Sequence, residues 1–148
     1  MSAAYDPELI LIIEDSENEA LLLRRALQRN QFTGSIVHLL NGHEAMKYLH
    51  GASPYGDRQL HPLPGLILTD LQMPLMDGFE VLAAVRIHIS CCVIPVIVLS
   101  NSDDQGDIYK AYQLGANSYI AKPRALDDLI QTVGLVIKYW RACQKPIP

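Results

Sequence analysis

The sequence has little of several features that would assign a chain to a particular class of protein. Only three of its 148 residues are cysteines, and Cys91 and Cys92 are adjacent, which is neither a disulfide framework nor a metal-binding spacing. We therefore expect reduced thiols, as in a cytoplasmic protein. The apolar runs are too short to span a bilayer, and the first residues lack the basic start and apolar stretch of a secretory signal.

Positive charge is also scarce. Lys and Arg number 12 against 16 Asp and Glu, the formal net charge is −4, and no run or stripe of basic residues occurs. A nucleic-acid-binding surface needs concentrated positive charge, so we expect neither nucleic acid nor membrane as a partner. Hydrophobic residues make up 49% of the chain, which is typical of an ordinary globular protein. We expect a single domain over 1–148, with its core at about 8–142.

Short apolar runs alternate with longer segments of helical periodicity. The predicted strands are 9–13, 35–40, 66–69, 96–99 and 118–121, and the predicted helices are near 17–30, 42–50, 78–89, 105–114 and 125–142. Three of the strands are apolar almost throughout, as in buried parallel strands. Alternating strands and helices are typical of βαβ crossovers. The sequence therefore predicts an α/β fold, doubly wound, with a mostly parallel sheet covered on both faces.

The predicted helices carry start and stop signals. Capping boxes open four of them: Ser16 with Glu19, Asn41 with Glu44, Asp77 with Glu80, and Ser102 with Gln105. Gly51 and Gly115 follow helix ends, where a left-handed residue is needed. A loop insertion rich in proline and glycine, GASPYGDRQLHPLPG, occupies 51–65 and is long for a compact domain. It is either a passive surface excursion or a functional element.

Polar residues follow the predicted strands at one edge of the sheet. Glu14 and Asp15 follow the first strand, Asp70 the third, Ser100 the fourth and Lys122 the fifth. Each could merely terminate a strand. The carboxyl ends of parallel strands meet at one edge, however, and ligands bind there. Three carboxylates held together need a cation between them, and oxygen ligands alone select a hard ion such as Mg²⁺. A lysine beside that ion suits a dianionic group.

These residues resemble the motifs of the response regulator receiver domain of two-component signalling, over essentially the whole chain. The motifs are the Glu14-Asp15 pair, DLQMPLMDG from Asp70, PVIVLSNS with Ser100, and SYIAKP with Lys122-Pro123. The resemblance implies a flavodoxin-like fold: a five-stranded parallel sheet in the order 2-1-3-4-5 with five helices. It also implies that Asp70 accepts a phosphoryl group from the phosphohistidine of a sensor histidine kinase.

The resemblance also implies roles for the neighbouring residues. Asp15, Asp70 and the backbone carbonyl of Gln72 would hold Mg²⁺, for which Mn²⁺ could substitute, and Glu14 would assist through water. Lys122 and Ser100 would contact the phosphoryl group. Ser100 and Tyr119 would act as the switch, although Tyr119 could equally be a half-buried strand tyrosine. The Lys122–Pro123 bond resembles the family's cis peptide.

The output is expected to be docking or dimerisation. An apolar stripe on the last helix, from Leu126 to Trp140, is either an extended core face or part of a homodimer surface formed with the fourth helix, the fifth strand and the C-terminal tail. The insertion and the YLHG before it are similar to single-domain regulators of phytochromes, cyanobacterial ones in particular. A phytochrome kinase is therefore the expected partner.

Three other functions are compatible with an α/β fold of this kind. An aspartyl-phosphate phosphatase or phosphotransferase would have a second acid two residues after its nucleophile, where this chain has Gln72, so we expect no enzyme activity beyond self-catalysed phosphorylation and dephosphorylation. A flavin- or nucleotide-binding module would need a Ser/Thr/Gly-rich loop where this chain has EDSENE. A degenerate receiver that docks without phosphorylation is disfavoured by the complete set of Asp15, Asp70, Ser100 and Lys122.

Overall fold

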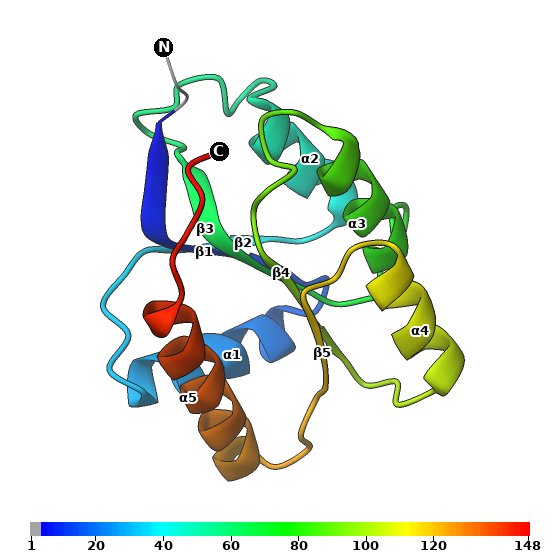
Figure 1. Cartoon of the computed structure of the whole chain (residues 1–148). Coiled ribbons are helices and arrows are strands. Elements are labelled where there is room, and N and C mark those ends of the chain that lie inside the picture. Colours follow the sequence, from blue (N-terminus) through cyan, green and yellow to red (C-terminus); the bar gives the residue numbers. More distant parts are fainter. Residues whose placement is uncertain (1–3) are drawn as a thin grey trace.

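The computed structural model describes residues 4–148, in which five strands alternate with five helices (Figure 1). The elements are β1 (Tyr5–Ile13), α1 (Glu17–Arg29), β2 (Ile36–Leu39), α2 (Gly42–His50), β3 (Leu63–Thr69), α3 (Gly78–Ile87), β4 (Val96–Ser100), α4 (Gln105–Gln113), β5 (Ser118–Ala121) and α5 (Leu126–Ala142). The strands form one parallel sheet in the order β2-β1-β3-β4-β5. The predicted fold class, strand order and number of helices are confirmed.

Helices cover both faces of the sheet. In Figure 1, α1 and α5 lie on one side of the strands and α2, α3 and α4 on the other. Successive residues of β1 divide between these faces: Leu9, Leu11 and Ile13 pack with α2 and α3, whereas Ile10 and Ile12 pack with α1 and α5. The alternation follows from the two-residue period of a strand. The sheet is thus buried on both faces, and the polar residues lie at the edge formed by the carboxyl ends of the strands.

Two strands begin earlier than the sequence predicts. β1 begins at Tyr5 and β3 at Leu63, and their first residues pair as Tyr5↔Leu63 and Asp6↔Pro64. The last three residues of the predicted 51–65 insertion are therefore buried strand. Proline and glycine are poor strand formers, which is why the prediction failed here. At Gly65 a side chain would overlap the backbone of Pro7, so the close approach of the two strands explains the glycine.

The rest of the insertion is fastened to α2. The guanidinium of Arg58 donates hydrogen bonds to the carbonyl oxygens of Tyr48 and Leu49, both at 2.7 Å, and so satisfies carbonyls at the end of the helix. The hydroxyl of Tyr55 donates to Oε2 of Glu44 at 2.9 Å, and that of Tyr48 donates to the carbonyl of Pro62 at 2.8 Å. The loop therefore has a defined conformation and packs on α2.

The helix caps agree with three of the four predictions. Ser16, Asn41 and Asp77 each accept a hydrogen bond from the backbone N–H three residues later, and Gly51 and Gly115 have positive φ. The prediction for α4 was wrong. Its N-cap is Asp104, which accepts from the N–H of Asp107, while the hydroxyl of Ser102 donates to the Asp107 carboxylate. Ser and Asp are about equally good N-caps, so residue type alone could not choose between Ser102 and Asp104.

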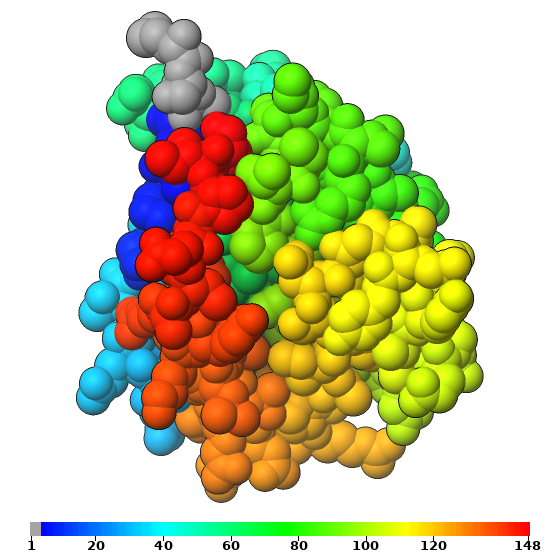
Figure 2. Space-filling view, in the orientation of Figure 1, coloured from blue at the N-terminus to red at the C-terminus, as the bar shows by residue number. Residues whose placement is uncertain are grey.

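The stripe on α5 is mostly core. Val133, Ile137 and Trp140 are buried against the sheet, whereas Leu135 and Tyr139, off the stripe, are each 71% exposed. The tail after Ala142 continues beyond α5 along the surface of its own molecule, red beside the blue of β1 in Figure 2, with the ammonium of Lys145 4.8 Å from the centre of the Trp140 ring. All three cysteines are free, and only Cys91 is fully buried. Within residues 4–148, no helix is long and apolar enough to cross a membrane.

Candidate functional site

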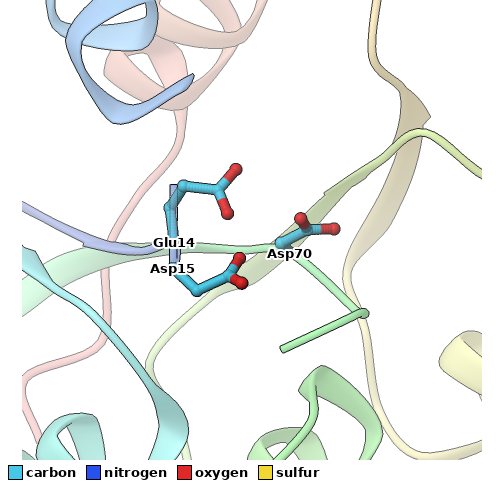
Figure 3. A group of neighbouring side chains, drawn as sticks. All are labelled: Glu14, Asp15 and Asp70. Carbon is cyan, nitrogen blue, oxygen red and sulfur yellow. The ribbon is translucent and has the colours of Figure 1, made fainter. Parts of the chain in front are cut away.

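Three carboxylates meet where β1 and β3 end. Glu14 and Asp15 follow β1, Asp70 follows β3, and one oxygen from each lies within 4.8 Å of the others (Figure 3). The strands are neighbours, and the N–H of Asp70 donates to the carbonyl of Ile13 at 3.1 Å, which fixes the approach. Glu14 and Asp70 are only 4% and 8% exposed, whereas Asp15 is exposed. This oxygen-only donor set fits a hard divalent cation.

Lys122 reaches the same cluster from the end of β5. Its Nζ lies 2.6 Å from Oε1 of Glu14, 2.9 Å from Oε2 of Glu19 and 3.3 Å from Oδ2 of Asp70. The backbone N–H of Lys122 donates to the carbonyl of Ser100 at 2.7 Å, which aligns the end of β5 with that of β4. A positive charge thus lies among the carboxylates, where it can pair with an anionic group on Asp70.

Burial and charge shift the pKa of the groups around this lysine. Burial raises the pKa of Glu14 to about 8, and the hydrogen bond from Lys122 only partly opposes this. Hydrogen bonds with Glu14, Lys122 and Asn101 lower the pKa of Glu19 to about 2. Burial alone would lower the pKa of Lys122, but its hydrogen bonds with Glu14 and Glu19 outweigh burial and raise it. Lys122 is therefore a permanent cation near neutral pH.

The Asp70 carboxylate has one oriented oxygen and one that faces the lysine. Its Oδ1 accepts from the N–H of Leu71 at 2.7 Å, and its Oδ2 is the atom near Lys122. The hydroxyl of Thr69 donates to the Asp70 carbonyl at 2.9 Å. These contacts fix the direction in which the carboxylate points, so an attacking oxygen is held in place before any reaction.

Ser100 and Tyr119 converge on one residue, Ser102. Oγ of the buried Ser100 accepts from the N–H of Ser102 at 3.1 Å, and the half-buried Tyr119 donates its hydroxyl to the carbonyl of Ser102 at 2.7 Å. Within the part of the chain described, Ser100 forms no hydrogen bond with Asp70. The two predicted switch residues are thus linked to each other through the β4–α4 loop.

Glu19 also belongs to this site, although its sequence pattern indicates only a capping box. Its N–H does donate to the cap Ser16, but its side chain does not return to the N–H of Ser16. Instead Oε2 contacts Lys122, and Oε1 accepts from Nδ2 of Asn101 at 3.4 Å. No signal in the sequence distinguishes this side-chain direction from that of an ordinary capping box.

Two further predictions concern the loops around the site. The Lys122–Pro123 peptide is trans, and the cis peptide among residues 4–148 is Ser53–Pro54, so the expected cis bond was wrong. The lysine reaches the carboxylates without it. Gln72 follows Asp70 closely in the loop and is exposed. The role of its backbone carbonyl as a metal ligand remains a prediction.

Comparison with known proteins agrees with this geometry. The family model "Response regulator receiver domain" matches residues 10–134. The probable methanogenesis regulatory protein FilR2 of Methanothrix harundinacea is 39% identical over 137 residues, which cover 93% of this chain and 86% of FilR2. The response regulator Rcp1 of Synechocystis is 34% identical over 134 residues, which cover 90% of this chain and 89% of Rcp1.

Solved structures give the same assignment. The phosphorylated cyanobacterial phytochrome response regulator RcpA has a TM-score of 0.86 at 34% identity, covering 93% of this chain and 97% of RcpA. The Mn²⁺-bound form of Rcp1 has a TM-score of 0.83 at 33% identity, covering 93% of this chain and 98% of that one. With its strand order, its carboxylates at the sheet edge and this family match, the chain belongs to the response regulator receiver domain family.

Proposed function

We propose that this chain is a single-domain response regulator whose Asp70 accepts a phosphoryl group from a sensor histidine kinase in a Mg²⁺-dependent reaction. The observation that carries the proposal is the meeting of Glu14, Asp15 and Asp70 with the ammonium of Lys122 at one edge of the sheet. Carboxylates beside a fixed cation suit transfer of a dianionic group, since charge neutralisation and positioning dominate phosphoryl transfer.

The proposed chemistry is a displacement at phosphorus. A carboxylate oxygen of Asp70 forms the new O–P bond while the bond from phosphorus to the donor's imidazole nitrogen breaks, and the imidazole leaves with the electron pair and takes up a proton. Lys122 pairs with the phosphoryl oxygens as a point charge. The hydrogen bond from Leu71 to Oδ1 keeps the carboxylate oriented during the approach. Ser100 donates its hydroxyl to the phosphoryl group after transfer.

The chain's own oxygens would hold the divalent ion. Asp15, Asp70 and the carbonyl of Gln72 are the proposed ligands, and Glu14 assists through water. The ion supplies positive charge that shields the phosphoryl oxygens from the attacking carboxylate. Mg²⁺ is the proposed ion and Mn²⁺ a substitute, which is supported by the Mn²⁺-bound form of the related regulator Rcp1.

The proposed switch uses the link through Ser102. When the Ser100 hydroxyl turns to the phosphoryl group, its bond from the N–H of Ser102 is lost. Tyr119, which donates to the carbonyl of the same residue, then loses a fixed partner and can move into the space left by Ser100. The movement would alter the surface of α4, β5 and α5, which with the C-terminal tail is the proposed homodimer surface. The exposed Leu135 and Tyr139 support that part of the proposal.

A phytochrome histidine kinase is the proposed phosphodonor. RcpA is named as a phytochrome response regulator, and two further solved relatives at 30% identity are named as bacteriophytochrome response regulators. FilR2 is named for methanogenesis, so the receiver assignment does not depend on the phytochrome one. We place the protein in the cytoplasm, without nucleic acid or membrane as partners and without turnover of external substrates.

Mass spectrometry of the intact protein tests the proposal. After incubation with acetyl phosphate and Mg²⁺, the unaltered protein should gain about 80 Da, the mass of one phosphoryl group. Asp70→Asn should show no gain, while Asp77→Asn, a helix-cap variant in the same loop, should retain it. Omission of Mg²⁺ should prevent the gain in every sample. No gain in the unaltered protein, with magnesium bound, would instead support a receiver that docks partners without phosphorylation.

A further inference from the structure

Lys122 contacts three acidic side chains, and two of them belong to the cluster that a metal ion would occupy. Three carboxylates, those of Glu14, Glu19 and Asp70, lie within 3.3 Å of its ammonium. An ammonium has three N–H donors, so these contacts use all of them. Glu14 and Asp70 belong to the acidic cluster that could hold a metal, and Glu19 does not. A cation that enters the cluster would therefore bind Glu14 and Asp70 and leave Glu19 free to contact Lys122.

A divalent ion in the cluster competes with the ammonium for Glu14 and Asp70. The ion needs electron pairs on these carboxylates, and its charge repels a second cation a few ångströms away. Lys122 must then give up part of its contact with both. Glu19 lies outside the cluster and stays available to the ammonium.

Glu19 is held in a position that suits this task. Its backbone is fixed at the start of α1 by the hydrogen bond to Ser16 Oγ, at 3.2 Å. Its two carboxylate oxygens have different partners, with Asn101 on Oε1 and Lys122 on Oε2. The side chains of Glu19 and Lys122 are 37% and 14% exposed, so water screens the pair mainly from the Glu19 side.

We infer that Glu19 is a positioning residue that holds the ammonium of Lys122 beside the metal position, within reach of phosphoryl oxygens on Asp70. This inference rests on the proposed function of Asp70. Glu19 acts through Lys122 and contacts neither the ion nor the reacting atoms. Without it, Lys122 would remain on Glu14 and Asp70, where it opposes entry of the ion.

Magnesium titration of three proteins tests the inference. Isothermal calorimetry should show that Glu19→Gln binds Mg²⁺ about fivefold more weakly than the unaltered protein, the size expected of one partly exposed ion pair. Glu17→Gln is the matched control. Glu17 lies in the same first turn of α1, is exposed, and has no side-chain hydrogen bond or ion pair with residues 4–148. It should change the affinity less than twofold.

The same titration in a Lys122→Ala background separates an effect through Lys122 from a general effect of charge. Lys122→Ala itself should bind Mg²⁺ more tightly, because the competing ammonium is gone. Adding Glu19→Gln to it should change the affinity less than twofold, since Glu19 then has no lysine to hold. A merely structural role of Glu19 would give the same loss in both backgrounds.

Each outcome decides the inference. An equal loss with and without Lys122, an equal loss in the Glu17 control, or no loss in Glu19→Gln would each overturn it while leaving the proposed receiver function intact. Absence of magnesium uptake by the unaltered protein would overturn both. A loss that requires Lys122 and is specific to Glu19 supports it.

Discussion

Gly78, the first residue of α3, packs directly against the backbone carbonyl of Asp70. A β carbon at Gly78 would overlap that carbonyl oxygen and lie 2.8 Å from Cα of Leu71. The N–H of Gly78 also donates to the carbonyl of Leu71 at 2.9 Å. The loop that carries Asp70 can therefore adopt this conformation only with glycine at position 78.

Gly78→Ala should displace the Asp70 loop. We expect the free energy of unfolding to fall by about 2 kcal/mol, as for overpacking of a buried site, and phosphorylation by acetyl phosphate to slow. Urea denaturation measures the first effect and intact mass against time the second. Gly56→Ala is the control, because its β carbon would meet only the carbonyl oxygen of Gly51, at an ordinary 3.6 Å. Equal stability of the two variants would contradict the packing argument.

Arg86→Ala should be among the most destabilising changes at a half-buried position. The guanidinium donates hydrogen bonds to four acceptors, namely the carbonyl oxygens of Cys92, Ile94 and Gly115, and Oδ1 of Asn117. Several would lose their partner, so we expect a loss of about 3 kcal/mol in urea denaturation. Arg25→Ala removes an exposed arginine from α1 and should change the stability by less than about 0.5 kcal/mol. A similar small change in Arg86→Ala would show that water replaces these bonds.

Tyr119→Phe should weaken the link between β5 and the β4–α4 loop. Loss of the 2.7 Å hydrogen bond to the Ser102 carbonyl should cost about 1 kcal/mol of unfolding free energy. Amide hydrogen exchange should also become faster around Ser102. Tyr109→Phe, at an exposed position on α4 with no hydroxyl hydrogen bond to residues 4–148, should change neither quantity. If exchange near Ser102 is unaltered in Tyr119→Phe, the hydroxyl does not hold this loop.

The stability of the metal-free protein should depend on pH through Glu14. Its carboxyl has a pKa of about 8 in the folded protein and 4.5 as the reference value, so the folded state binds the proton more tightly between these limits. The contribution of Glu14 is therefore most favourable below pH 4.5 and is lost as the pH rises through 8. The lowered pKa of Glu19 makes stability depend on pH only below pH 4.5, where the contribution of Glu19 is lost as the pH falls toward 2.

Denaturation in the presence of a chelator at pH 5, 6, 7 and 8 measures this dependence. The difference in unfolding free energy between the unaltered protein and Glu14→Gln should shift in favour of Glu14→Gln as the pH rises. Comparison with this variant cancels the opposite slope from His50, whose pKa is lowered by burial. A difference that is constant with pH would mean that Glu14 is already ionised at pH 5.

The sheet and most of the site were predictable because they rest on local patterns. Apolar runs such as 96–99 identify buried strands, and the polar residue that follows each one is then placed at the sheet edge by topology alone. Glu14, Asp15, Asp70 and Lys122 were found in this way and do converge. Ser100 lies at the same edge, but its hydroxyl oxygen accepts a hydrogen bond from the N–H of Ser102 instead of contacting Asp70.

What could not be predicted depends on contacts between distant segments. Leu63 and Pro64 lie in a strand because they pair with Tyr5 and Asp6, and this pairing outweighs the poor strand propensity of Pro64. The side chain of Glu19 turns to Lys122 because of a charge more than a hundred residues away, while its own neighbours specify only a helix start. Local sequence cannot choose between two such directions.

The Arg58-fastened loop and the acidic cluster lie at opposite ends of β3, separated by a buried strand of about 20 Å. A change in the length or sequence of this loop could therefore affect the reactive carboxylates only through the buried backbone of β3. The length and composition of this loop can therefore vary among related proteins without a direct effect on the geometry of the carboxylates.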